Sequence, residues 1–146
     1  MGKILKIASI ASEVAPFSKT GGLADVARSL PKALCRLGHE VIVITPLYNQ
    51  IIDKSTHKLK EIYHDVLLNV GGQTVKVNYW QGYLMEGLPV YFVEQLEYFG
   101  SSPKIYGLPN DNARFYLFDV ASLRLLELIQ FQPDIIHCHD WQTGLI

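Results

Sequence analysis

The sequence predicts an α/β fold in which a mostly parallel, doubly wound sheet carries an inserted antiparallel hairpin. Residues 41–45 form a continuous run of mainly β-branched residues, typical of a strand buried on both faces of a parallel sheet. A helical pattern separates this run from an earlier apolar strand, which completes a strand–helix–strand unit. Farther along, two segments that read as strands flank a pair of glycines, and this pattern favours a hairpin.

The strand–helix–strand unit begins with a short Ile- and Leu-rich strand over residues 3–9. A polar, glycine-containing stretch over 12–22 follows, and apolar residues then repeat at helical spacing from Leu23 until Gly38, a typical C-terminal signal. Pro31 interrupts this pattern. We therefore expect either a kinked helix or two short helices with Pro31 near the first position of the second.

The middle of the chain changes to strand patterns. Residues 62–70 and 74–80 predict the two strands of the hairpin, joined by Gly71 and Gly72, and we expect Tyr79, Trp80 and Tyr83 to pack within it. A further buried strand is predicted over 90–93. Residues 97–109 are rich in Gly, Pro and Ser and predict a long loop, and loops of this length are often functional.

A second helix is predicted over 112–130, with Asn110 or Asp111 as its N-cap and an apolar stripe that faces the core. A last strand over 134–138 follows, and residues 139–144 open the next connection. Doubly wound sheets usually carry about five or six strands, with a helix after each parallel strand. We therefore expect an incomplete sheet, and a chain that is the first part of a longer protein.

The composition excludes several classes of function. The 146 residues contain 13 Lys+Arg and 14 Asp+Glu, with a formal net charge of -1 and no basic block, so we expect no nucleic-acid partner. No stretch approaches the ~20 consecutive apolar residues of a membrane helix, so we expect no membrane partner. Cys35 and Cys138 lack the spacing of a disulfide framework or a zinc site, which predicts a reducing, cytoplasmic compartment.

One candidate site is the glycine-rich segment that leads from the first strand into the first helix. It contains Lys19, Thr20, Gly21 and Gly22. Paired glycines let a ligand approach the backbone, and the free N–H groups and dipole of a helix N-terminus favour an anion, with Lys19 as a mobile positive charge. The segment matches neither the P-loop nor the G-x-G-x-x-G pattern. A diphosphate site and a surface turn with a solvated lysine both remain open.

The second candidate is the segment His137-Cys138-His139-Asp140-Trp141, which follows the last strand. Its two histidines share a face at i, i+2, but a third metal ligand is missing, so we predict no metal site. We expect a buried structural His137 and an exposed His139 that hydrogen-bonds a sugar hydroxyl. Both candidates follow strands, and ligands of open parallel sheets bind at the carboxyl ends of strands, so one site can include both.

Four further residues are candidates with two interpretations each. Asp25 and Glu13 either favour the helix N-terminus electrostatically or contact a ligand. Tyr106 and Phe99, in the long loop, either line a sugar site or pack locally.

These motifs, in this order, identify a resemblance to bacterial glycogen synthases and plant starch synthases. The resemblance spans the chain, and the combination of Lys-Thr-Gly-Gly-Leu with His-Asp-Trp is far more specific than either motif alone. The matching segments are residues 12–26, Leu30-Pro31-Lys32-Ala33-Leu34, residues 37–41, Asp111-Asn112, Arg114-Phe115, residues 133–137, His139-Asp140-Trp141 and Gly144.

The resemblance implies a retaining glucosyltransferase with two Rossmann-like domains, a GT-B fold, that moves glucose from ADP-glucose to the non-reducing end of an α-1,4-glucan. It implies no cofactor and no metal. Lys19 and the backbone of Gly21 and Gly22 would meet the nucleotide-sugar phosphates, while Asp25 and His139 would face the glucose or acceptor side. Lys19 would then stabilise charge on the departing diphosphate.

The carboxyl-terminal domain of that family, which supplies most of the nucleotide pocket, has no counterpart in residues 1–146. We therefore expect a partial amino-terminal catalytic domain without synthase activity of its own, since the transfer needs a closed interdomain cleft. Two alternatives are a non-catalytic module that binds a glucan or a partner, and a fragment of a related UDP-sugar glycosyltransferase. The chain start, without a transit segment, favours a bacterial cytoplasmic protein over a plastid one.

Overall fold

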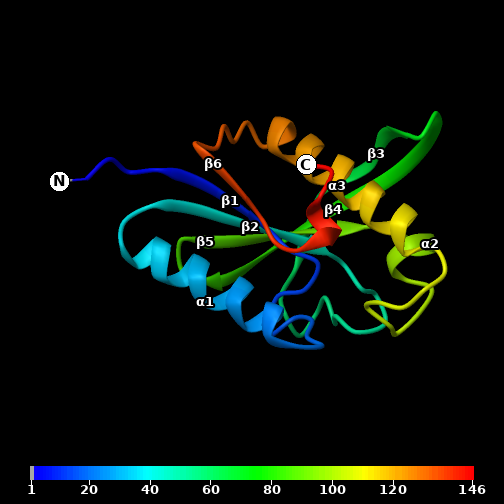
Figure 1. Cartoon of the computed structure of the whole chain (residues 1–146), viewed down its shortest axis with the longest axis horizontal. Helices are drawn as coiled ribbons and strands as arrows, with labels where there is room; N and C mark the ends of the chain where they lie inside the picture. The colour runs from blue at the N-terminus through cyan, green and yellow to red at the C-terminus, as the bar shows by residue number, and fades with distance from the viewer. Residues whose placement is uncertain (1) are drawn as a thin grey trace.

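A computed structural model describes residues 2–146 as one six-stranded sheet with helices on both faces (Figure 1). The strand order is β3-β4-β5-β2-β1-β6. Four neighbouring strands are parallel: β5 (Leu88–Glu94), β2 (Glu40–Pro46), β1 (Lys6–Ile10) and β6 (Ile135–Cys138). The other two, β3 (Lys60–Val70) and β4 (Gln73–Met85), form the antiparallel hairpin on the β5 side.

The two long helices cover opposite faces of the sheet. Helix α1 (Gly22–Arg36) connects β1 to β2, and α3 (Asp111–Leu128) lies between β5 and β6. These connections cross the sheet in opposite directions, so right-handed crossovers place the helices on opposite faces. Figure 1 shows α1 below the strands and α3 above them. The predicted doubly wound α/β sheet with an inserted hairpin is thereby confirmed.

The hairpin turn follows the prediction in detail. Gly71 and Gly72 both have positive φ, 59° and 80°, a conformation that side chains with a Cβ rarely adopt. Tyr79 is fully buried, and its hydroxyl donates to the Ala121 carbonyl oxygen of α3 at 2.8 Å. Tyr83 is 60 % exposed, so the expectation that it packs in the hairpin is wrong.

Several helices and strands differ from their predicted ranges. Strand β1 begins at Lys6, three residues late, because pairing with β2 starts at Lys6 and Glu40. Pro31 lies inside one continuous helix, so the alternative of two short helices is wrong. The long loop contains a one-turn helix, α2 (Leu96–Phe99), whose N-cap Gln95 accepts hydrogen bonds from two backbone amides. Four residues are too few for a periodic pattern to show.

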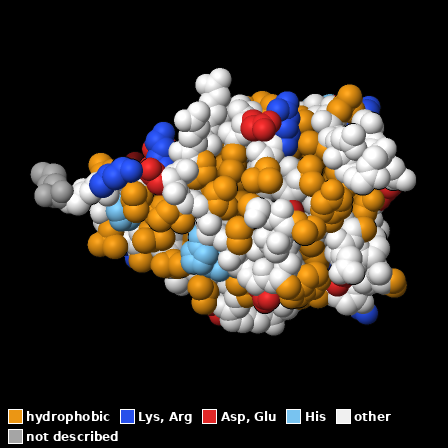
Figure 2. Space-filling view, turned by 45° about the horizontal axis from the view of Figure 1, so that its top comes forward, with side chains coloured by type: hydrophobic (Ala, Val, Ile, Leu, Met, Phe, Trp, Pro, Cys, Tyr) orange, Lys and Arg blue, Asp and Glu red, His pale blue; other side chains and the backbone are white. Residues whose placement is uncertain are grey.

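The core fills the space between the sheet and the two helices. Within the described chain, 2–146, no helix is long and apolar enough to cross a membrane. Figure 2, turned so that the top of Figure 1 comes forward, shows apolar side chains gathered over that face. Exposed apolar side chains on the edge strand β6 and the segment after it are Ile135, Ile136, Trp141 and Leu145.

Candidate functional site

The carboxyl end of β1 connects the predicted site segments. Three side chains there each contact a different one: Ser9 contacts His139, Ser12 contacts Tyr106, and Glu13 contacts the glycine-rich segment at Thr20. In a parallel sheet, the loops that follow neighbouring strands emerge at the same end. The tertiary structure therefore joins segments that are more than one hundred residues apart in the chain.

Glu13 organises the glycine-rich segment. Its buried carboxylate accepts hydrogen bonds from the backbone amides of Thr20 (2.9 Å), Gly21 (3.3 Å) and Ala24 (3.2 Å), and from the Thr20 hydroxyl (2.7 Å). The free N-terminal amides expected for an anion site are thus partly occupied by a side chain. Glu13 acts on the helix N-terminus, as one of its two interpretations proposed, and it also sets the shape of the segment.

The outer side of the glycine-rich segment is open. A Cβ atom built on Gly21 or Gly22 would meet no other atom within 4 Å. The amides of Gly22 and Leu23 have no protein acceptor among the hydrogen bonds of residues 2–146. An anion can therefore approach the backbone on the side that faces away from Glu13.

Lys19 forms an exposed ion pair with Asp25 in this structure. Its ammonium group contacts both carboxylate oxygens of Asp25, at 2.9 and 2.7 Å. Both side chains are about half exposed, at 53% and 55%, and ion pairs this exposed contribute at most about 1 kcal/mol. Breaking this ion pair therefore has a small energetic cost.

Phe99 packs locally, as one of its two interpretations proposed, whereas the sugar contact of Tyr106 stays a prediction. Phe99 is buried at 1% exposure and packs edge-on against Tyr48, so it belongs to the core. Tyr106 is half-buried, and its hydroxyl lies 2.6 Å from Ser12 Oγ. Burial raises the pKa of Tyr106 far above its usual value, so its hydroxyl stays protonated and can donate a hydrogen bond.

The burial expected for the two histidines is reversed. His139 is buried, with Nε2 3.2 Å from Ser9 Oγ, whereas His137 is only partly buried. The cause is position: His137 lies on the edge strand β6, while His139 lies beyond its end, beside β1. The rings stack with centroids 4.1 Å apart. Burial, and secondarily His137, lower the pKa of His139, which keeps the imidazole neutral at pH 7.

Asp140 carries backbone strain that sequence patterns did not reveal. Its φ of 63° and ψ of -176° fall in a region that is essentially restricted to glycine. The Asp140 carboxylate accepts from the Trp141 amide at 2.7 Å, and the Thr143 hydroxyl bonds the Asp140 carbonyl oxygen. Such strain costs about 1–3 kcal/mol and clusters at functional sites. We therefore keep Asp140 among the candidate residues, since the motif already offered Asp140 or Trp141 as a group that could orient or stack on a ligand.

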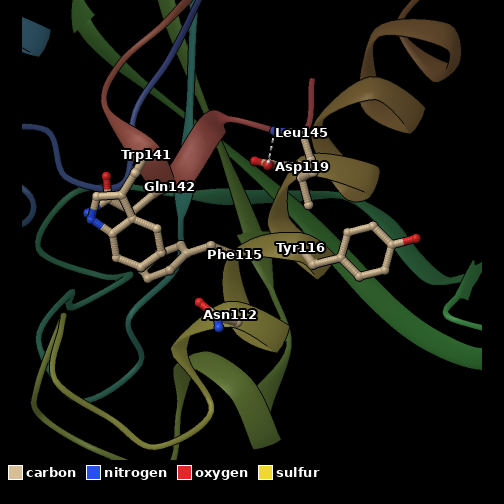
Figure 3. Close-up of a pocket in the computed structure, with 7 residues that line it drawn as sticks. All are labelled: Asn112, Phe115, Tyr116, Asp119, Trp141, Gln142 and Leu145. Carbon is tan, nitrogen blue, oxygen red and sulfur yellow. Dashed lines mark hydrogen bonds between the residues drawn. The ribbon is translucent and has the colours of Figure 1, made fainter.

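A pocket of about 190 Å³ lies beside this segment, between α3 and the 3-10 helix η1 (Trp141–Thr143) (Figure 3). Asp119 is buried in it and accepts the Leu145 amide through one oxygen, at 3.1 Å. The other Asp119 oxygen, Oδ1, and Gln142 Oε1 have no hydrogen-bond partner. Burial raises the pKa of Asp119 to about 7. The remaining lining residues are Asn112, Phe115, Tyr116 and Trp141.

Residues 2–146 hold no cluster of three or more His, Cys, Asp or Glu side chains placed to bind a metal ion. Near His139 and His137, the groups that the structure places in contact are a serine hydroxyl and the second imidazole. Metal ligands would need a further carboxylate, thiolate or imidazole there.

Comparison with known proteins identifies a family for residues 6–146. Residues 6–146 match the family described as starch synthase catalytic domain. Glycogen synthase from Moorella thermoacetica is 45% identical over 150 residues, which cover 100% of this chain and 29% of that protein. Glycogen synthase from Geotalea uraniireducens is 42% identical over 147 residues, covering 97% and 30%. This chain thus spans about 30% of the length of the curated relatives.

A solved structure agrees with the sequence comparison. The catalytic domain of starch synthase IV from Arabidopsis thaliana, bound to ADP and acarbose, superposes with a TM-score of 0.87 at 39% identity. The match covers 97% of this chain and 29% of that one. The fold, the order of the two motifs and the family match over residues 6–146 lead to one conclusion: this chain belongs to the starch synthase catalytic domain family.

Proposed function

We propose that this chain is the amino-terminal part of a retaining glucosyltransferase that transfers glucose from ADP-glucose to the non-reducing end of an α-1,4-glucan. The observation that carries the proposal is the meeting of three segments at the end of β1. They are the glycine-rich segment, the Tyr106 loop and the segment from His139 to Trp141. The Arabidopsis relative with the same fold binds ADP and acarbose, a nucleotide and a carbohydrate.

The geometry suggests a role for each side of this region. The open backbone at Gly21 and Gly22 faces the diphosphate, and Lys19 leaves Asp25 to neutralise charge on the leaving group. The Thr20 hydroxyl donates a hydrogen bond to the Glu13 carboxylate and so helps to hold the glycine-rich segment in place. On the other side, neutral His139 and the protonated hydroxyl of Tyr106 are hydrogen-bonding groups suited to sugar hydroxyls.

The proposal includes a second, carboxyl-terminal domain that closes over this region. The chain spans about 30% of its relatives' length, so most of their residues have no counterpart here. Closure would exclude water and complete the donor site, because a retaining transfer needs both substrates held in place. We also propose a bacterial cytoplasmic location for the whole protein.

A chimera tests the proposed function. This chain would replace the matching amino-terminal segment of the Moorella glycogen synthase, and incorporation of labelled glucose from ADP-glucose into glycogen would be measured. We expect transfer by the chimera, no transfer by the 146-residue chain alone, and weaker transfer from UDP-glucose. Lys19→Gln should lower kcat about 100-fold, as the loss of one charge-stabilising contact does elsewhere.

The matched control is Lys60→Gln, which removes the same charge from exposed strand β3. A folded chimera that binds ADP-glucose but transfers no glucose would refute the catalytic proposal and favour a binding module. If Lys19→Gln and Lys60→Gln behave alike, Lys19 has no role at the diphosphate.

A further inference from the structure

Arg114 is a fully buried cation in the first turn of α3, with 1% of its surface exposed. Its guanidinium donates to the Tyr98 carbonyl oxygen at 2.7 Å and to the Ile105 carbonyl oxygen at 3.0 Å. It also donates to the Asp111 carboxylate at 2.7 Å. The guanidinium lies 5.3 Å from the ring centroids of both Phe99 and Phe115. The Nε and Nη1 atoms of this planar group are therefore both engaged, and two aromatic rings lie beside it.

Asp111 continues these contacts into the loop. Its two carboxylate oxygens accept the backbone amides of Gly107 (2.8 Å) and Leu108 (3.2 Å). Arg114 and Asp111 thus hold the residue before Tyr106 by its carbonyl oxygen and the two residues after it by their amides. We call these two side chains the loop clamp.

The loop clamp fixes the one side chain of this loop that reaches the candidate site. Tyr106 is held at the backbone on both sides, its ring packs against Phe115 with centroids 6.0 Å apart, and its hydroxyl lies on Ser12. Ser12 precedes Glu13, which shapes the glycine-rich segment. A small displacement of the loop would therefore move Tyr106 away from Ser12, whereas the four hydrogen bonds that Glu13 accepts all come from the glycine-rich segment and the start of α1.

A contribution to folding stability does not by itself explain why Arg114 and Asp111 form an ion pair here. Burying an arginine and a carboxylate removes both from water, and the pair often stabilises a fold no better than apolar residues of similar volume. The fork of an arginine does offer fixed directions that a lysine cannot reproduce. Arg114 uses those directions on two loop carbonyl oxygens, which sets the backbone conformation of the loop.

We propose that Arg114 and Asp111 are positioning residues that hold Tyr106 for contact with the glucan acceptor. The inference rests on the proposed function, because it assigns Tyr106 to the carbohydrate side of the site. It goes further in making acceptor binding, and not nucleotide binding, depend on a buried arginine and a partly buried aspartate that touch neither substrate.

Ligand titrations of the 146-residue chain, followed by NMR, test the inference. The variants are Arg114→Lys, which keeps the charge and loses the fork, and Asp111→Asn. The control is Arg124→Lys, an exposed arginine of the same helix that pairs with Glu127. Maltoheptaose and ADP are titrated separately, and hydrogen exchange is measured at Gly107 and Leu108 and at Gly21 and Ala24.

In both clamp variants we expect about tenfold weaker maltoheptaose binding, since an error of about 1 Å in a positioning group has effects of this order or larger. Exchange at Gly107 and Leu108 should accelerate, whereas ADP binding and exchange at Gly21 and Ala24 should match the wild type. The control should behave as wild type throughout.

Three outcomes would overturn the inference. Unchanged maltoheptaose binding despite faster exchange at Gly107 would mean that the loop conformation does not matter for the acceptor. An equal loss of ADP and maltoheptaose binding would mean that the clamp only stabilises the fold. ADP binding without maltoheptaose binding in the wild type would remove Tyr106 from the acceptor side. If the wild type binds neither ligand, the same titrations are made on the chimera with the Moorella protein. Maltoheptaose binding there that the clamp variants leave unchanged would overturn the inference, whereas a folded chimera that binds neither ligand would overturn the proposed function.

Discussion

Replacing Asp119 by asparagine is expected to stabilise the chain at pH 8 and to change its stability little at pH 4.5. Burial raises the pKa of Asp119 from 3.8 to about 7. The folded chain therefore keeps this proton up to about pH 7, whereas the unfolded chain loses it near pH 3.8. Between these values the unfolded state binds fewer protons, so stability falls as pH rises, and the full penalty is present above pH 7.

The size of the effect follows from the same numbers. The pKa of Asp119 rises from 3.8 to about 7, and each pKa unit corresponds to about 1.4 kcal/mol. Ionisation of Asp119 therefore lowers the free energy of unfolding by at most about 4 kcal/mol. Relaxation of the folded chain and entry of water into the neighbouring pocket of about 190 Å³ reduce such a penalty in real proteins. We therefore expect a gain of about 2 kcal/mol for Asp119→Asn at pH 8. The Leu145 amide keeps its acceptor, because asparagine retains one carbonyl oxygen.

Urea denaturation of both proteins at pH 4.5 and pH 8, at constant ionic strength, measures this difference. Asp134→Asn is the matched control, since hydrogen bonds from the Lys6 amide and from Lys3 lower the pKa of that exposed carboxyl. Its stability contribution is present above the usual carboxyl pKa, so the control should lose stability at pH 8. A difference between Asp119→Asn and wild type that stays constant with pH would refute the reasoning.

Three further substitutions follow from the site and the core. Glu13→Gln should cost about 1–3 kcal/mol in urea denaturation, because an amide NH₂ then faces backbone donors; unchanged exchange at the Gly21 amide would contradict this. Asp25→Asn should change stability by less than about 1 kcal/mol and raise ADP affinity, since it frees Lys19; weaker ADP binding in a titration would instead make Asp25 a ligand contact. Tyr79→Phe should cost about 1 kcal/mol in thermal unfolding by removing the bond to Ala121, and a neutral result would show that water replaces the hydroxyl.

Local sequence patterns were enough to predict most of the helices and strands. The β-branched run of β2, the helical spacing of α1 and the turn at Gly71 and Gly72 are each specified by neighbouring residues, and each was predicted. Helix α2 was missed because one turn is shorter than the period that reveals a helix. The burial of His139 was predicted wrongly, because it depends on which strand forms the edge of the sheet.

The candidate site, too, was predicted only in part from the sequence. The sequence located the glycine-rich segment and the segment around His139, and it placed both at carboxyl ends of strands. It did not identify the partners of Glu13, which lie 7 to 11 residues away, or the contact between Ser12 and Tyr106, 94 residues apart. Contacts of this kind leave no periodic signal, since each depends on one side chain reaching one distant group.

By itself, the sequence determined the α/β class, the inserted hairpin, the two site segments and the family resemblance, because short-range periodicity and motif order encode them. The tertiary structure alone decided how those segments work together. It joined Lys19 to Asp25, turned Glu13 toward the amides of the glycine-rich segment and buried Arg114 where it holds the Tyr106 loop. The physical reason is that hydrogen bonds and burial depend on distances in space, which only the packing of β1 against β2 and β6 establishes.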